Sequence, residues 1–119
     1  MIKHTLFVYG TLKQHHHNHH LLSTSKYLGT VKTIEKYSLF VSTIPFVSKH
    51  PQTSVIHGEL YSVDDCTLAR LDRLEGHPQW YKREEVDILL DNAQIVAAWL
   101  YFNPEPTGDL VSSGKYELR

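Results

Sequence analysis

Residues 64–78, DDCTLARLDRLEGHP, contain the start, the apolar face and the end of one helix. Asp64 is placed to cap the first turn, because its carboxylate can accept a hydrogen bond from a free backbone N–H. Gly76 and Pro78 supply the stop, since glycine tolerates the left-handed conformation that ends a helix and proline cannot continue one. The segment therefore predicts a helix over residues 64–75, the principal helix of the chain.

Short segments on both sides of this helix are rich in β-branched and aromatic residues and are separated by turn residues. They predict strands at residues 4–9, 27–35, 37–41, 55–63, 81–90 and 94–102, with a hairpin turn at Asp91-Asn92. Residues 11–25 are polar and predict a loop with room for one helical turn at residues 18–23. We expect irregular chain around Pro45 and Pro51, and a turn-rich tail after Pro104.

Five or six short strands with one principal helix give the α+β class. Open sheets of such short strands would leave unpaired edges, so we expect a small closed or nearly closed β-barrel, mixed but mostly antiparallel. Gly58 lies inside a predicted strand and marks either a bulge or a point of close backbone approach. The length of 119 residues fits a single domain over residues 1–119.

The composition excludes several classes of protein. The chain has 12 Lys and Arg against 13 Asp and Glu, so a formal charge of −1 gives no electrostatic footprint for nucleic acid. Its apolar runs are too short for a membrane-spanning helix, and its first residues lack the apolar core of a signal peptide. The single cysteine, Cys66, excludes an internal disulfide and suggests a reducing compartment. We expect a cytoplasmic protein, monomeric by default, with no nucleic-acid or membrane partner.

A carboxylate falls on the buried face of the predicted helix. Leu68, Leu71 and Leu74 define an apolar stripe, and Glu75 lies seven residues after the first and four after the second. Burial and the negative end of the helix dipole both disfavour the charged form, so both raise the pKa of this carboxyl group. The alternative is that the last turn frays and the Glu75 side chain turns into water.

The first predicted strand ends in a turn that could bind an anion. Tyr9-Gly10-Thr11-Leu12 follows an apolar strand, and backbone N–H groups that leave a strand edge at a tight turn can converge on an oxyanion. Alone, the pattern fits an ordinary turn. Together with Glu75 it supplies an acid/base group and a donor loop, which are two parts of an acyl-transfer site. We therefore predict that residues 10–12 and Glu75 line one cavity.

Five short motifs occur in a fixed order along the chain: residues 7–13 (FVYGTLK), 18–22 (NHHLL), 58–61 (GELY), 71–76 (LDRLEG) and 81–83 (YKR). In content and order they resemble the γ-glutamylcyclotransferase-like family. The chain is most similar to the γ-glutamylamine cyclotransferase branch and to related short bacterial proteins. The resemblance covers roughly residues 5–102, and residues 113–116 weakly resemble the closing segment of the family.

This resemblance implies a small mixed β-barrel with flanking helices, no cofactor, no metal and a small γ-glutamyl compound as substrate. Members of the family convert γ-glutamyl compounds into 5-oxoproline and a released amine. Because the α-amine of the substrate is itself the nucleophile, an acid/base group and correct positioning would suffice. By resemblance, Glu75 is the catalytic acid/base, and the substrate-binding residues are Tyr9, Gly10, Thr11, Leu12 and Tyr81.

The chain departs from the family pattern at His15, where relatives carry a glycine two residues after the motif lysine. The loop is therefore bulkier and less flexible, which bears on the choice of substrate more than on the chemistry. His15 also begins a cluster with His16, His17, His19 and His20. Imidazoles bind Zn²⁺ or Ni²⁺, but specific sites usually draw ligands from separated elements. We interpret the cluster as a source of weak, adventitious metal binding.

Other features allow alternatives. Cys66 lies near the predicted helix N-terminus, where a thiol pKa can fall, but no base is placed beside it, so we interpret it as a buried structural residue. His57 and His77 could assist catalysis, although a structural or surface role is favoured. A non-catalytic module that binds a small γ-glutamyl or amino-acid ligand is the second class of function. Glu75 argues against it, because a binder has no use for a carboxylate in so costly a position.

Overall fold

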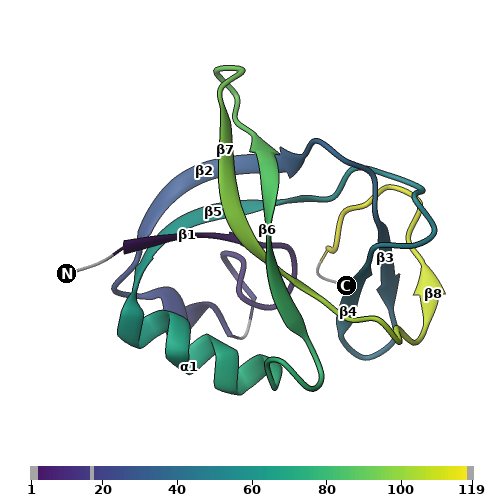
Figure 1. Cartoon of the computed structure of the whole chain (residues 1–119), viewed down its shortest axis with the longest axis horizontal. Helices are drawn as coiled ribbons and strands as arrows, with labels where there is room; N and C mark the ends of the chain where they lie inside the picture. Colours follow the sequence, from purple (N-terminus) through teal and green to yellow (C-terminus); the bar gives the residue numbers. More distant parts are fainter. Residues whose placement is uncertain (1–2, 17, 118–119) are drawn as a thin grey trace.

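The computed structural model describes residues 3–16 and 18–117 (Figure 1). The elements of this part of the chain are, in order, β1 (Lys3–Val8), the 3-10 helix η1 (His19–Leu22), β2 (Lys26–Thr33), β3 (Ser38–Val41), β4 (Pro45–Ser48), β5 (His57–Asp64), α1 (Asp65–Glu75), β6 (Lys82–Leu89), β7 (Ile95–Phe102) and β8 (Asp109–Leu110). The predicted strands, the helical turn and the principal helix are all present, with ends displaced by a few residues.

Five strands close into a barrel in the order β1-β5-β2-β6-β7. Their pairing is antiparallel except where β7 meets β1 in parallel at the pair of Leu6 and Trp99, so the predicted mixed, mostly antiparallel barrel is confirmed. Gly58 marks a close approach between β5 and β1, because a Cβ atom there would lie 2.3 Å from the carbonyl oxygen of Val8. The bulge lies elsewhere, in β2 between Tyr27 and Gly29.

A second sheet of three short strands, in the order β4-β3-β8, lies beside the barrel (Figure 1). The expectation of irregular chain around Pro45 is therefore wrong, and the turn-rich tail also contains one short strand, β8. Pro45 begins β4, a position where the missing backbone N–H of proline is tolerated, and all four residues of β4 are buried. β8 has only two residues, too few to leave a periodic pattern.

Helix α1 begins and ends as its sequence predicts. The Asp64 carboxylate accepts a hydrogen bond of 2.8 Å from the backbone N–H of Thr67. Gly76 takes a left-handed conformation, with φ of 64°, and its N–H points back to the carbonyl groups of the last turn. The N–H of His77 donates to the carbonyl oxygen of Asp72 at 2.9 Å, which completes the C-terminal cap of the helix.

The buried face of α1 differs from the predicted stripe at one position. Leu68 and Leu71 are buried under the barrel, but the Leu74 side chain is 41% exposed, so its place in the buried stripe is wrong. At about 100° per residue, Glu75 points between Leu68 and Leu71, whereas Leu74 points about 60° beyond Leu71. The carboxylate is therefore closer to the centre of the buried face than the leucine that precedes it.

Cys66 corrects a second prediction about this helix, because the structure shows it exposed. Two residues before Leu68, it points about 160° away from the buried face. The described part of the chain contains no helix that is long and apolar enough to cross a membrane.

Replacement of the two leucines by alanine tests this orientation of α1. We expect Leu71→Ala to lower the free energy of unfolding by about 2–5 kcal/mol, because it leaves a cavity in a closely packed region. Leu74→Ala is the matched control and should cost less than about 1 kcal/mol, since its side chain is already partly in water. Urea unfolding of both variants measures the difference, and equal losses would contradict the orientation.

Candidate active site

A cavity of about 160 Å³ lies between the loop after β1, the start of β4 and the C-terminal end of α1. All six residues that the sequence singled out line it: Tyr9, Gly10, Thr11, Leu12, Glu75 and Tyr81. The predicted meeting of residues 10–12 with Glu75 in one cavity is therefore present in the structure. The chemical role of each residue stays a prediction.

Glu75 carries the only charged side chain among the described residues that line the cavity. Burial raises the pKa of its carboxyl group from the ordinary 4.5 to about 7. No described side chain donates a hydrogen bond to it or forms an ion pair with it. Its backbone carbonyl accepts a hydrogen bond of 3.1 Å from the N–H of Tyr81, so the last turn is held in place. The alternative of a frayed helix end with Glu75 in water is wrong.

The loop after β1 forms another part of the cavity lining. The N–H of Lys13 donates to the carbonyl oxygen of Gly10 at 3.0 Å and closes the turn. Asn18 clamps the loop, because its N–H donates to the Thr11 carbonyl at 3.0 Å and its side-chain amide to the Thr11 hydroxyl at 2.9 Å. Within the described chain, the N–H groups of Gly10, Thr11 and Leu12 donate to no acceptor. They are free to bind an anion.

Gly10 is required at this turn by the approach of β4. A Cβ atom on Gly10 would lie 2.5 Å from Cγ of Pro45, closer than two carbon atoms can pack. The strand that the sequence analysis missed therefore forms one wall of the cavity and fixes the path of the donor loop.

Tyrosine side chains form the floor of the cavity. The Tyr9 hydroxyl donates to the carbonyl oxygen of Tyr101 at 2.7 Å, and the Tyr81 hydroxyl donates to that of Pro45 at 2.8 Å. Burial, with the nearby Glu75 carboxylate as a further cause, raises the pKa of all three tyrosines well above the ordinary 10. These rings are therefore neutral, and the hydroxyl protons of Tyr9 and Tyr81 are committed to backbone acceptors.

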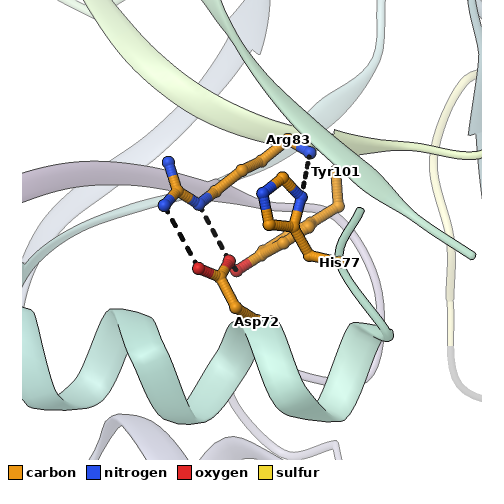
Figure 2. Close-up of polar contacts among 4 residues, drawn as sticks. All are labelled: Asp72, His77, Arg83 and Tyr101. Carbon is orange, nitrogen blue, oxygen red and sulfur yellow. Dashed lines mark hydrogen bonds and ion pairs between the residues drawn. The ribbon is translucent and has the colours of Figure 1, made fainter. Parts of the chain in front are cut away.

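A polar network holds α1 against β6 and β7 (Figure 2). Arg83 donates two hydrogen bonds to the Asp72 carboxylate, at 2.8 and 3.1 Å, and the Tyr101 hydroxyl donates a third at 2.7 Å. Burial alone would raise the pKa of Asp72, but these bonds lower it. Asp72 lies three residues before Glu75, so the network holds the part of α1 that carries Glu75 against the barrel.

Asp72, Arg83 and Tyr101 were not among the predicted site residues. Asp72 and Arg83 lie inside two of the motifs that carried the resemblance, which was the available signal. His77 accepts a hydrogen bond from the backbone N–H of Arg83 at 3.2 Å, so its role is structural, as favoured (Figure 2).

Among the described residues, no three His, Cys, Asp or Glu side chains are grouped so that they could hold a metal ion. Nδ1 of His19 lies 2.9 Å from the carbonyl oxygen of Leu12, on the loop that lines the cavity. His15 has a φ of 71°, the left-handed region that favours glycine. His17 lies outside the described residues.

The chain is similar in sequence to known proteins of one family. Residues 6–118 match the family model described as "Gamma-glutamyl cyclotransferase, AIG2-like". A protein of Methanocaldococcus jannaschii named "Putative gamma-glutamylcyclotransferase" is 49% identical over 113 residues, which cover 94% of both chains. "Gamma-glutamylaminecyclotransferase C" of Danio rerio is 37% identical over 97 residues, 74% of this chain and 64% of that protein.

The crystal structure of an AIG2-like protein from Mus musculus has the same fold. It superposes with a TM-score of 0.89 over 98% of this chain and 90% of that one, at 24% identity.

The raised pKa of Glu75 predicts a pH-dependent effect of Glu75→Gln on stability. Between pH 4.5 and about 7 the folded protein keeps a proton that the unfolded chain has lost, so the free energy of unfolding falls as pH rises through this range. Glutamine has no such proton. We expect the variant to match the wild type below pH 4.5 and to be more stable by on the order of 1–3 kcal/mol at pH 8.

Urea unfolding of the wild type and of Glu75→Gln, below pH 4.5 and at pH 8, measures this difference. Glu85→Gln, which changes an exposed carboxylate on β6, is the control and should show no comparable gain. A Glu75→Gln variant that gains nothing at pH 8 would show that the carboxyl group is not buried.

Proposed function

This chain belongs to the AIG2-like gamma-glutamyl cyclotransferase family, and from that premise we propose that it releases an amine from a γ-glutamyl compound by closing the glutamyl part into 5-oxoproline. Its relatives are named gamma-glutamylcyclotransferases, so it is an enzyme of this type. The observation that carries the proposed reaction is a carboxyl group with a pKa of about 7 in the same cavity as three free backbone donors.

The proposed reaction is an intramolecular aminolysis. The α-amine nitrogen of the substrate attacks its own γ-carbonyl carbon and forms the lactam C–N bond, and the original amide C–N bond breaks. The α-ammonium group loses two protons in forming the lactam, and the departing amine gains two. Glu75 accepts one from the attacking nitrogen and delivers it to the leaving nitrogen, while the other is exchanged through water. No oxidant, reductant or second substrate is needed.

The pKa of Glu75 suits this proton transfer. An ordinary glutamate, with a pKa near 4.3, is a poor base for an α-amine near 8, and the mismatch is worth about 5 kcal/mol. At about 7, the pKa of the Glu75 carboxyl leaves a gap of about one unit, or roughly 1.4 kcal/mol. The same group can then return the proton readily, because a pKa near the working pH serves both directions.

The donor loop suits the charged end of the substrate. The free N–H groups of residues 10–12 can receive the α-carboxylate in the ground state or the oxyanion that develops on the γ-carbonyl. Both anions belong to the glutamyl part, so in either case this part lies at the loop side of the cavity. Holding the amine and carbonyl of one molecule in reach replaces much of the chemistry that other acyl transfers require.

Turnover by Glu75→Gln tests the proposal. Glutamine keeps the size of the side chain but cannot take up the ammonium proton, so we expect 5-oxoproline release to fall by at least about 10⁴-fold. Release of 5-oxoproline from a panel of γ-glutamyl amides and amino acids is the assay, and Glu85→Gln should keep the wild-type rate.

A Glu75→Gln variant that keeps more than about a tenth of the activity would show that another group carries the proton. If the wild type is stabilised by these compounds but releases neither amine nor 5-oxoproline, the protein is the non-catalytic binding module instead.

A further inference from the structure

The lysine that follows the donor loop is buried. Lys13 is only 8% exposed, an unusual degree of burial for a lysine. Burial lowers the pKa of its ammonium group, and the nearby Glu59 carboxylate raises that pKa by a smaller amount. A charged group in such a position costs free energy unless it is well bonded. Lys13 does not line the cavity, so contact with a bound substrate does not explain its position.

The partner of Lys13 comes from the other end of the chain. The Lys13 ammonium group donates a hydrogen bond to the backbone carbonyl oxygen of Tyr116. Its Nζ atom lies 5.9 Å from the centroid of the Tyr116 ring, and the His16 ring packs against the same ring at 5.3 Å between centroids. The loop after β1 therefore contacts both the backbone and the ring of Tyr116.

Residues 111–117, which we call the C-terminal segment, are themselves held by the second sheet and by the barrel. The N–H of Val111 donates to the carbonyl oxygen of Leu39 on β3 at 2.7 Å, and the carbonyl oxygen of Gly114 accepts from the N–H of His57 on β5 at 2.9 Å. A Cβ atom on Gly114 would lie 2.0 Å from a backbone carbonyl oxygen just before β5, so the segment packs closely there. It is a fixed support for the Lys13 side chain.

The backbone on both sides of Lys13 is also held. The N–H of Lys13 donates to the carbonyl oxygen of Gly10 at 3.0 Å, so Lys13 is part of the turn that carries the free donors. The next N–H, that of Gln14, donates at 2.9 Å to the Glu59 carboxylate on β5. Because Lys13 directly follows residues 10–12, a change in where its side chain is bound changes the directions of their N–H groups.

We propose that Lys13 is a positioning residue for the reaction: by binding the C-terminal segment, it sets the directions of the N–H groups of residues 10–12 that receive the anion of the substrate. The inference rests on the proposed function. It gives the C-terminal segment a part in the site, although none of residues 111–117 lines the cavity. Lys13 acts through the loop and takes no part in the proton transfer.

Replacement of Lys13 by methionine tests this role. Methionine keeps much of the apolar length of the side chain but cannot donate to the Tyr116 carbonyl oxygen. We expect kcat/KM for the γ-glutamyl amide that the wild type converts fastest to fall by about 10- to 100-fold, because small displacements of positioning groups have effects of this size. Lys13→Arg retains an N–H donor and should stay within about fivefold of the wild type. Lys36→Met changes an exposed lysine between β2 and β3 and, as the control, should keep the wild-type rate.

A measurement without substrate separates positioning of the loop from a general loss of stability. ¹⁵N relaxation gives an order parameter for each backbone N–H group. For Gly10, Thr11 and Leu12 we expect values of about 0.85 in the wild type and in Lys13→Arg, and below about 0.6 in Lys13→Met. The values for β1 and β5 should not change. A merely destabilised protein would keep the wild-type values in its folded molecules.

Unchanged order parameters at residues 10–12 in Lys13→Met would overturn the proposal, and so would a kcat/KM within about twofold of the wild type. An equal loss of activity in Lys13→Arg would do the same, because the hydrogen bond to the C-terminal segment could then not be the cause. Loss of order at residues 10–12 in Lys13→Met, with a wild type that releases no 5-oxoproline, would support the binding of the loop through Lys13 and contradict the proposed reaction. An ordered loop in Lys13→Met, with an active wild type, would contradict only this inference.

Discussion

The carboxyl group of Glu75 lines the cavity at the negative end of α1, where it is largely removed from water and no described cation is paired with it. Water would stabilise its ionised form, and an ordinary helix end would turn the side chain outward. Here the left-handed Gly76 and the hydrogen bond from Tyr81 to the Glu75 carbonyl hold the last turn closed. A pKa of about 7 suits a group that accepts and returns a proton near neutral pH, which is the role that we propose for Glu75.

The surrounding fold maintains this unfavourable position. Leu68 and Leu71 fasten α1 under the barrel, and Asp72 binds it to β6 and β7 through Arg83. The barrel brings the loop after β1 close to the C-terminal end of α1, so that these two distant parts of the chain line one cavity (Figure 1). The cavity thus combines one carboxyl group, a loop whose backbone N–H groups have no described acceptor, and apolar side chains.

Local patterns in the sequence were sufficient for the helix, its two ends and the misplaced Glu75, because capping and helical periodicity act within a few residues. Long-range contacts were not predictable in the same way. β4 begins at a proline and has only four residues, so its pairing with β3, rather than its own sequence, makes it a strand. The exposure of Leu74 and the pairing of Asp72 with Arg83 likewise depend on where α1 lies against the barrel.

Burial is what would make Glu75 an acid/base group matched to neutral pH. An NMR titration of its side-chain carboxyl carbon, assigned by comparison with Glu75→Gln, measures this property directly and without substrate. We predict a midpoint of about 7 in the free protein. A midpoint near the ordinary 4.5 would show a solvated carboxylate and would contradict the proposed role of Glu75.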